Sequence, residues 1–180
     1  MFLTFLQLIS NTVLSDSFPT RCYVKSDVVT NIYCPRSNIT SLPVSPPRFL
    51  YQVFLQQNHI ETIHDLSGFS FVYKMNLSHN VITIFPWESL KHMKSLHTLD
   101  LSHNRQNRIE TIHDLSGFSS VTKMNLSHNL ISIFPWKSLK QMSSLQNLDL
   151  SHNRITSVRL DLVTEGAPLL STVNVAYNRL

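Results

Sequence analysis

The sequence is poor in the residues that several kinds of functional site require. Only three of its 180 residues are glycine, which argues against a glycine-rich loop that cradles a phosphate. Its 15 basic and 11 acidic residues are scattered, so no basic patch for nucleic acid or lipid headgroups is predicted. No stretch beyond the N-terminus reaches the roughly 18 consecutive apolar residues that a membrane span needs. A hydrophobic content of 42 % still suffices for one domain with a sizeable core.

Cysteine is also scarce, and Cys22 and Cys34 are the only two. The eleven residues between them fit no zinc-site spacing, and no further thiol is present to complete such a site. Two interpretations remain open. In an exported chain the pair forms a disulfide, whereas in a cytosolic chain both stay free thiols.

The N-terminus favours export. An apolar stretch over residues 2–9 is followed by small polar residues, and Val13 and Ser15 suit the minus-three and minus-one positions of a signal-peptidase site. We therefore interpret residues 1–17 as a secretory signal peptide. The alternative is the apolar N-terminus of a chain truncated upstream.

Most of the chain consists of internal repeats. Residues 60–105 align with residues 109–154 at an offset of 49, with 37 of 46 positions identical and nine different. Inside each copy runs a shorter frame, L-x-x-L-x-L-x-x-N-x-L, in which other apolar residues also occupy the leucine positions. The frame occurs six times, with starts near residues 50, 72, 96, 121, 145 and 170. Its asparagines are Asn58, Asn80, Asn104, Asn129, Asn153 and Asn178.

This frame resembles the leucine-rich repeat family, and the resemblance covers residues 50–180. It implies an α/β solenoid with a curved parallel β-sheet on the concave side and irregular or short helical segments on the convex side. We expect about six repeats and no C-terminal cap within the chain. Each L-x-L is expected to be a short strand whose leucines point into the core, because side chains alternate along a strand. One repeat cannot bury its apolar side alone, so about three or more must stack.

The frame asparagine is expected to form a ladder between successive repeats. Its amide both donates and accepts hydrogen bonds, so stacked asparagines satisfy backbone groups that the chain reversal leaves unpaired. The spacings from Asn58 to Asn80 and on to Asn104 are 22 and 24 residues, or 46 in all, so the offset of 49 contains three extra residues within 105–108. We expect Asn104, rather than Asn107, to keep the ladder position. An imperfectly joined tandem duplication and a joining error in the predicted gene both explain this slip.

Residues 18–49 resemble the N-terminal cap of exported leucine-rich repeat proteins, through the stretch SNITSLPVSPPRFL. A cap is physically required, because the first repeat otherwise exposes its core. Such caps usually contain four cysteines, and this segment contains two. A bond between Cys22 and Cys34 would close a loop that stabilises the segment.

One outward column of the solenoid is rich in histidine. The residues just before the ladder asparagines are Gln57, His79, His103, His128, His152 and Tyr177. Four histidines in a line suggest a metal strip or a pH switch. No carboxylate or cysteine joins the column, so we favour a common turn sequence copied by duplication. We predict no metal site and no cofactor.

The predicted concave face carries a mixed polar surface with aromatic residues at its N-terminal end, which suits recognition of another protein. The predicted partner-binding residues are Tyr51, Phe54, Tyr73, Lys74, Asn76, His97, Asp100, Lys123, Asn125, Asp149 and Tyr177. Sequons for N-glycosylation occur at Asn38, Asn76 and Asn125. The expected partner is an unidentified protein ligand, with no nucleic acid and with membrane contact only through a possible anchor beyond Leu180.

No arrangement of nucleophile, base and acid indicates an enzyme. The family resemblance implies a non-enzymatic protein-binding module of a secreted or cell-surface protein, of receptor or adhesion type. Two alternatives stay open: a cytosolic scaffold or regulatory subunit with the same solenoid, and a fragment of a larger or misassembled gene product.

Overall fold

A computed structural model describes residues 22–26, 29–43, 46–47, 49–104, 112, 114–115 and 117–180. The predicted signal peptide and the predicted three-residue slip lie outside these residues. In the described part of the chain, no helix has both the length and the hydropathy needed to cross a bilayer.

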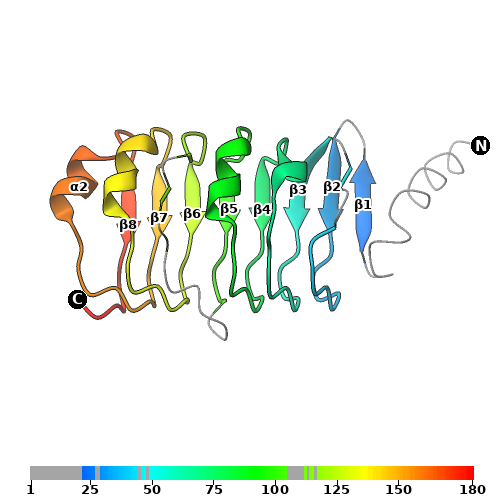
Figure 1. The fold of residues 1–180 in the computed structure, drawn as a ribbon, viewed down its shortest axis with the longest axis horizontal. Helices are drawn as coiled ribbons and strands as arrows, with labels where there is room; N and C mark the ends of the chain where they lie inside the picture. The colour runs from blue at the N-terminus through cyan, green and yellow to red at the C-terminus, as the bar shows by residue number, and fades with distance from the viewer. Residues whose placement is uncertain are drawn as a thin grey trace, which may run out of the picture.

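The described strands form one sheet, in which β1 to β8 stand side by side in sequence order (Figure 1). The first, β1, pairs antiparallel with β2, and β2 to β8 are parallel to one another. The bounds are β1 Tyr23–Ser26, β2 Thr30–Tyr33, β3 Leu50–Phe54, β4 Lys74–Asn76, β5 Thr98–Asp100, β6 Lys123–Asn125, β7 Asn147–Asp149 and β8 Thr172–Asn174. The α/β leucine-rich repeat solenoid predicted from the frame is therefore confirmed.

Short helical turns carry the chain back on the other side of the sheet. They are the 3-10 helices η1 Ser67–Phe69, η2 Trp87–His92 and η3 Trp136–Gln141, and the α-helix α2 Leu160–Glu165. Both η2 and η3 begin directly after a proline, whose fixed φ and missing N–H are tolerated at a helix start. Trp136 is buried and packs edge-on against Phe134, with ring centroids 4.8 Å apart. The copied tryptophans thus stand at the start of the return helices and pack there.

The frame leucines form one continuous core between the sheet and the return helices. Leu77, Leu101, Leu126 and Leu150 each have no exposed surface, and burying such a side chain contributes about 1.5–3 kcal/mol. From β4 onward each strand is only three residues long, because the L-x-L segment alone alternates between core and solvent. Packing between neighbouring coils therefore holds the short strands in register.

The asparagine ladder binds these coils together. In Asn80, Nδ2 donates to the carbonyl oxygen of Leu77 in its own coil (3.0 Å) and to that of Leu55 in the preceding coil (2.9 Å). Its Oδ1 accepts from the N–H of Ile60 at 3.0 Å. The same pattern recurs at Asn104, which is fully buried and occupies the ladder position.

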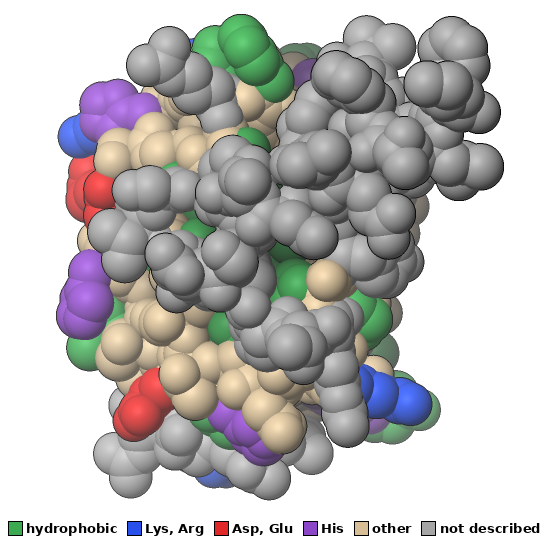
Figure 2. Space-filling model, turned by 90° about the vertical axis from the view of Figure 1, so that its right-hand side faces the viewer, with side chains coloured by type: hydrophobic (Ala, Val, Ile, Leu, Met, Phe, Trp, Pro, Cys, Tyr) green, Lys and Arg blue, Asp and Glu red, His purple; other side chains and the backbone are tan. Residues whose placement is uncertain are grey.

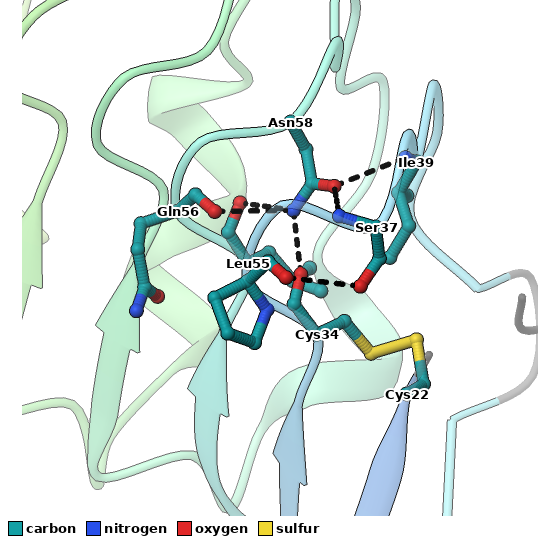
Figure 3. The surroundings of a disulfide bond; sticks show 8 residues. Cys22, Cys34, Ser37, Ile39, Leu55, Gln56 and Asn58 are labelled. Carbon is teal, nitrogen blue, oxygen red and sulfur yellow. Dashed lines mark hydrogen bonds between the residues drawn. A yellow bond between two sulfur atoms is a disulfide. The ribbon is translucent and has the colours of Figure 1, made fainter. Parts of the chain in front are cut away.

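The cap continues the ladder as an additional coil. Asn58 donates to the carbonyl oxygens of Leu55 and Cys34, and its Oδ1 accepts from the N–H groups of Ser37 and Ile39 (Figure 3). Cys34 is buried, is disulfide-bonded to Cys22 and takes the place that a leucine holds in later coils. The backbone that supports the first repeat is therefore covalently tied to β1.

One rung of the ladder is incomplete. The Oδ1 of Asn129 is buried and accepts no hydrogen bond from the described residues, although its Nδ2 donates to Leu101 and Leu126. In the other rungs of the repeats, the donor is the backbone N–H of the residue two positions after the preceding ladder asparagine. Ile131, two residues after Asn129, donates in this way to Oδ1 of Asn153. After Asn104 that place falls at Gln106, where the sequence carries its three extra residues.

Removing the slip is expected to stabilise the solenoid. Deletion of residues 106–108 places Ile109 two residues after Asn104, so its N–H becomes the missing donor to Asn129. Satisfying a buried acceptor is worth about 1–3 kcal/mol, and the midpoint of urea unfolding should rise accordingly. A control that keeps the length, Gln106→Ala with Arg108→Ala, should leave the midpoint nearly unchanged. A lower midpoint for the deletion would contradict this explanation of the slip.

Candidate binding surface

The outward side of the sheet, here called the strand face, presents three rows of side chains that run from coil to coil. The central row contains Phe54, Asn76, Asp100, Asn125, Asp149 and Asn174, which are aligned strand by strand. A second row, two positions earlier, contains Gln52, Lys74, Thr98, Lys123, Asn147 and Thr172. A third row lies one position before the second and includes Tyr51 in β3, and Tyr73 and His97 directly before β4 and β5. The ring of Tyr73 stacks on those of Tyr51 and His97. Ten of the eleven predicted partner-binding residues thus lie on one surface.

Tyr177 lies elsewhere. It ends the histidine column, where its ring stacks on His152 with centroids 4.3 Å apart. His79, His103, His128 and His152 also stack successively, with centroid distances of 4.0–4.1 Å. Every member of the column, from Gln57 to Tyr177, has a positive φ of 54–59°. Histidine is among the residues that tolerate this left-handed conformation better than most, so the column is first of all a feature of the turn.

The column does not have the geometry of a metal centre. Neighbouring imidazoles of the column stack nearly parallel, with interplanar angles of 8–12°. Within the described ranges, no group of three or more His, Cys, Asp or Glu side chains is placed to hold a metal ion.

The central row also forms a repeated local turn, one in each coil. The Oδ1 atoms of Asn76, Asp100, Asn125 and Asp149 each accept from the N–H of the serine two residues later, at 2.9–3.0 Å. Asparagine and aspartate alternate here because the turn uses only the oxygen that both share. These side chains therefore shape the strand ends while they also face solvent.

At the N-terminal end the strand face is aromatic. Tyr33 stacks on Phe54 with centroids 4.9 Å apart, and Nζ of Lys74 lies 5.2 Å from the centre of the Phe54 ring. Toward the C-terminal end the surface is polar, with a shallow hollow of about 360 Å³ lined by Asp100, Lys123 and Asp149 among others. One surface therefore offers two different chemistries.

Charge is sparse on the molecule. Figure 2 looks at the end near β1, and the described acidic and basic side chains there lie scattered around the rim. On the return side, hydrogen bonds from the hydroxyl and N–H of Ser67 lower the pKa of Asp65. The pKa of Asp161 is also lowered, by the bidentate hydrogen bonds from Arg159. Both carboxylates are exposed and organise local turns away from the strand face.

Sequence reasoning missed three features. It did not identify the central row as acceptors, although an Asn or Asp two residues before a serine was the visible signal. It did not extend the repeat into the cap, where Arg36 has the positive φ of the column and its Nε donates to Gln57. It also overlooked Phe49 and Phe71, whose rings meet across a coil with centroids 5.9 Å apart.

Comparison with known proteins places these observations in a family. The family model described as Leucine rich repeat matches residues 48–105 and 105–155. A curated relative, reticulon-4 receptor-like 2 of Homo sapiens, is 32 % identical over 101 residues, which is 56 % of this chain and 24 % of that protein. The solved structure of a TLR13–ssRNA13 complex superposes with a TM-score of 0.71 at 22 % identity, covering 90 % of this chain and 23 % of that one. The chain thus spans about a quarter of the length of each.

The central row gives a direct test of its dual role. Asp100→Asn keeps the oxygen that accepts from Ser102, so stability should change by less than about 0.5 kcal/mol. Asp100→Ala removes the acceptor and should cost about 1 kcal/mol, the usual net value of one such bond. Urea unfolding followed by circular dichroism measures both. Equal losses for the two variants would show that charge, rather than this hydrogen bond, matters at the position.

Proposed function

Because the chain belongs to the leucine-rich repeat family, we propose that it is a non-enzymatic protein-binding module of a secreted or cell-surface protein of receptor or adhesion type. The observation that carries the proposal is the strand face. It is a continuous array of outward side chains held in register by a buried core and an asparagine ladder. Such a surface reaches one partner with many side chains at once.

Several features support an extracellular setting. The Cys22–Cys34 disulfide suits an oxidising compartment, and the curated relative is named as a receptor-like protein. The apolar N-terminus suits a cleaved signal peptide.

The three sequons suit glycosylation of an exported chain. Asn38 is exposed in the cap, whereas Asn76 and Asn125 are half-buried on the strand face. Because Asn76 and Asn125 use only Oδ1 in the turn, the Nδ2 that a glycan would modify is not required there. Glycans at these two sites would restrict the part of the strand face that a partner contacts.

The experiment expresses the 180-residue chain from its own N-terminus in cultured mammalian cells. We expect it in the medium, shortened by about the predicted signal peptide, with a disulfide and with a mass that falls after enzymatic removal of N-glycans. The variant Asn38→Gln should reduce that mass shift. Binding of the purified product is then measured on an array of purified receptor ectodomains and extracellular matrix proteins.

We expect at least one ectodomain to bind, and binding should be weakened by Lys123→Glu on the strand face. Lys137→Glu makes the same change of charge at another exposed lysine, on η3; it is the matched control and should have no effect. A chain that stays in the cytosol with free thiols, or binding that responds only to the η3 variant, would contradict the proposal.

A further inference from the structure

An aromatic hollow lies at the N-terminal end of the strand face. It has a volume of about 450 Å³ and is lined by Val29, Phe49, Tyr51, Phe71, Tyr73, Lys94, Ser95 and His97. Phe49 and Phe71 are 67 % and 56 % exposed, which is unusual for two neighbouring large apolar side chains. The hollow joins this apolar edge to the row of stacked rings on the strand face.

The walls of the hollow are held in place by the fold. The ring of Tyr73 stacks between those of Tyr51 and His97, at centroid distances of 5.0 and 4.3 Å. The backbone N–H of Tyr73 donates to Tyr51, and that of His97 donates to Tyr73, both at 2.8 Å. Nδ1 of His97 donates to the carbonyl oxygen of Ser95 at 2.9 Å, which orients the imidazole. Little ordering would remain for an incoming group to impose.

The internal duplication singles out this hollow. Only nine of the 46 aligned positions differ between the two copies. Five residues that line the hollow belong to the first copy. At the average rate of difference between the copies, about one of the five would differ from its counterpart, but four do. Phe71, Tyr73, Lys94 and His97 correspond to Ser120, Thr122, Ser143 and Gln146, and only Ser95 has the same residue, Ser144, at its counterpart.

This concentration does not follow from exposure alone, because the other five differences are spread over the turns, the return side and the second row of the strand face. They are Val81, Thr83, Glu88, His92 and Thr98, none of which lines the hollow. The two copies therefore share a scaffold, and four of their nine differences fall in this one surface feature, as expected where one copy carries a specific contact.

The lining indicates the chemistry of the occupant. Aromatic walls fit a large apolar side chain, and aromatic residues dominate binding energy at protein interfaces. Among the described residues that line the hollow, the ammonium of Lys94 is the cation. No carboxylate occurs among the described residues that line it, so a neighbouring negative charge would be attracted.

We propose that the aromatic hollow seats an aromatic or large aliphatic side chain from an acidic segment of a protein partner. This inference rests on the proposed protein-binding function and names the part of the strand face that confers specificity. The rest of the strand face contributes complementarity around this anchor.

The test selects peptides from a random display library on the full chain. The key variant gives the hollow the residues of the second copy: Phe71→Ser, Tyr73→Thr, Lys94→Ser and His97→Gln. The control variant exchanges other copy differences: Val81→Leu, Thr83→Ser and His92→Gln. Each replacement already occurs at the equivalent place in this chain, so both variants are expected to fold, and circular dichroism verifies it.

We expect selected peptides to carry an aromatic or large aliphatic residue beside Asp or Glu. Their affinity should fall at least tenfold for the hollow variant and stay within twofold for the control. Lys94→Ser alone should weaken binding less, and raised salt should reduce its effect.

Peptides that bind the hollow variant equally well would overturn the assignment of the hollow while leaving the protein-binding function standing. Selected peptides that are predominantly basic would also overturn it. A chain that binds neither library peptides nor ectodomains fails the proposed function itself. If a single-stranded RNA bound more tightly than the selected peptides, and this binding depended on the same four residues, the hollow would be reassigned to nucleic acid.

Discussion

The structure depends on a buried carboxamide that each coil extends to the coil before it. An asparagine at this place satisfies carbonyl oxygens of two coils and an N–H of the earlier one, as at Asn80. These hydrogen bonds are buried, so each backbone group would carry the cost of an unpaired buried polar atom if the side chain were absent. The ladder therefore fixes the distance between successive coils, and the leucine side chains fill the interior of the solenoid at that distance.

The same constraint separates scaffold from function. Residues that point inward or form the ladder are identical in the two copies of the duplicated block. Leu77 corresponds to Leu126, for example, and Asn80 to Asn129. The outer surface is free to vary, because a side chain there alters no core contact. Phe71 and Tyr73 can thus be Ser120 and Thr122 in the second copy with the strands in the same register. A repeat protein of this kind acquires a binding site by changing a few exposed positions on an unchanged frame.

Much of this architecture was predictable because the frame repeats. Six occurrences of one pattern specify which leucines are buried, and the ladder position of Asn104 follows from counting residues. The remaining features depend on relations that a linear pattern does not express. Phe49 and Phe71 meet only once neighbouring coils are in register, and Arg36 joins the column although the cap shares few letters with the frame. Asp100 accepts from Ser102 through a local turn, whose signal was present but was interpreted only as a surface row.

Native-state hydrogen exchange measures the ladder most directly. The amides of Ile60, Ile82, Ile131 and Ile155 donate to ladder asparagines rather than to the sheet. The amides of Leu77, Leu101 and Leu126, directly after β4, β5 and β6, donate to the next strand and serve as the sheet amides for comparison. If the carboxamides hold the coils together, the isoleucine amides exchange as slowly as these, through the same cooperative opening. Exchange at the rate of exposed turns, while the sheet amides stay protected, would contradict the ladder as the element on which the solenoid depends.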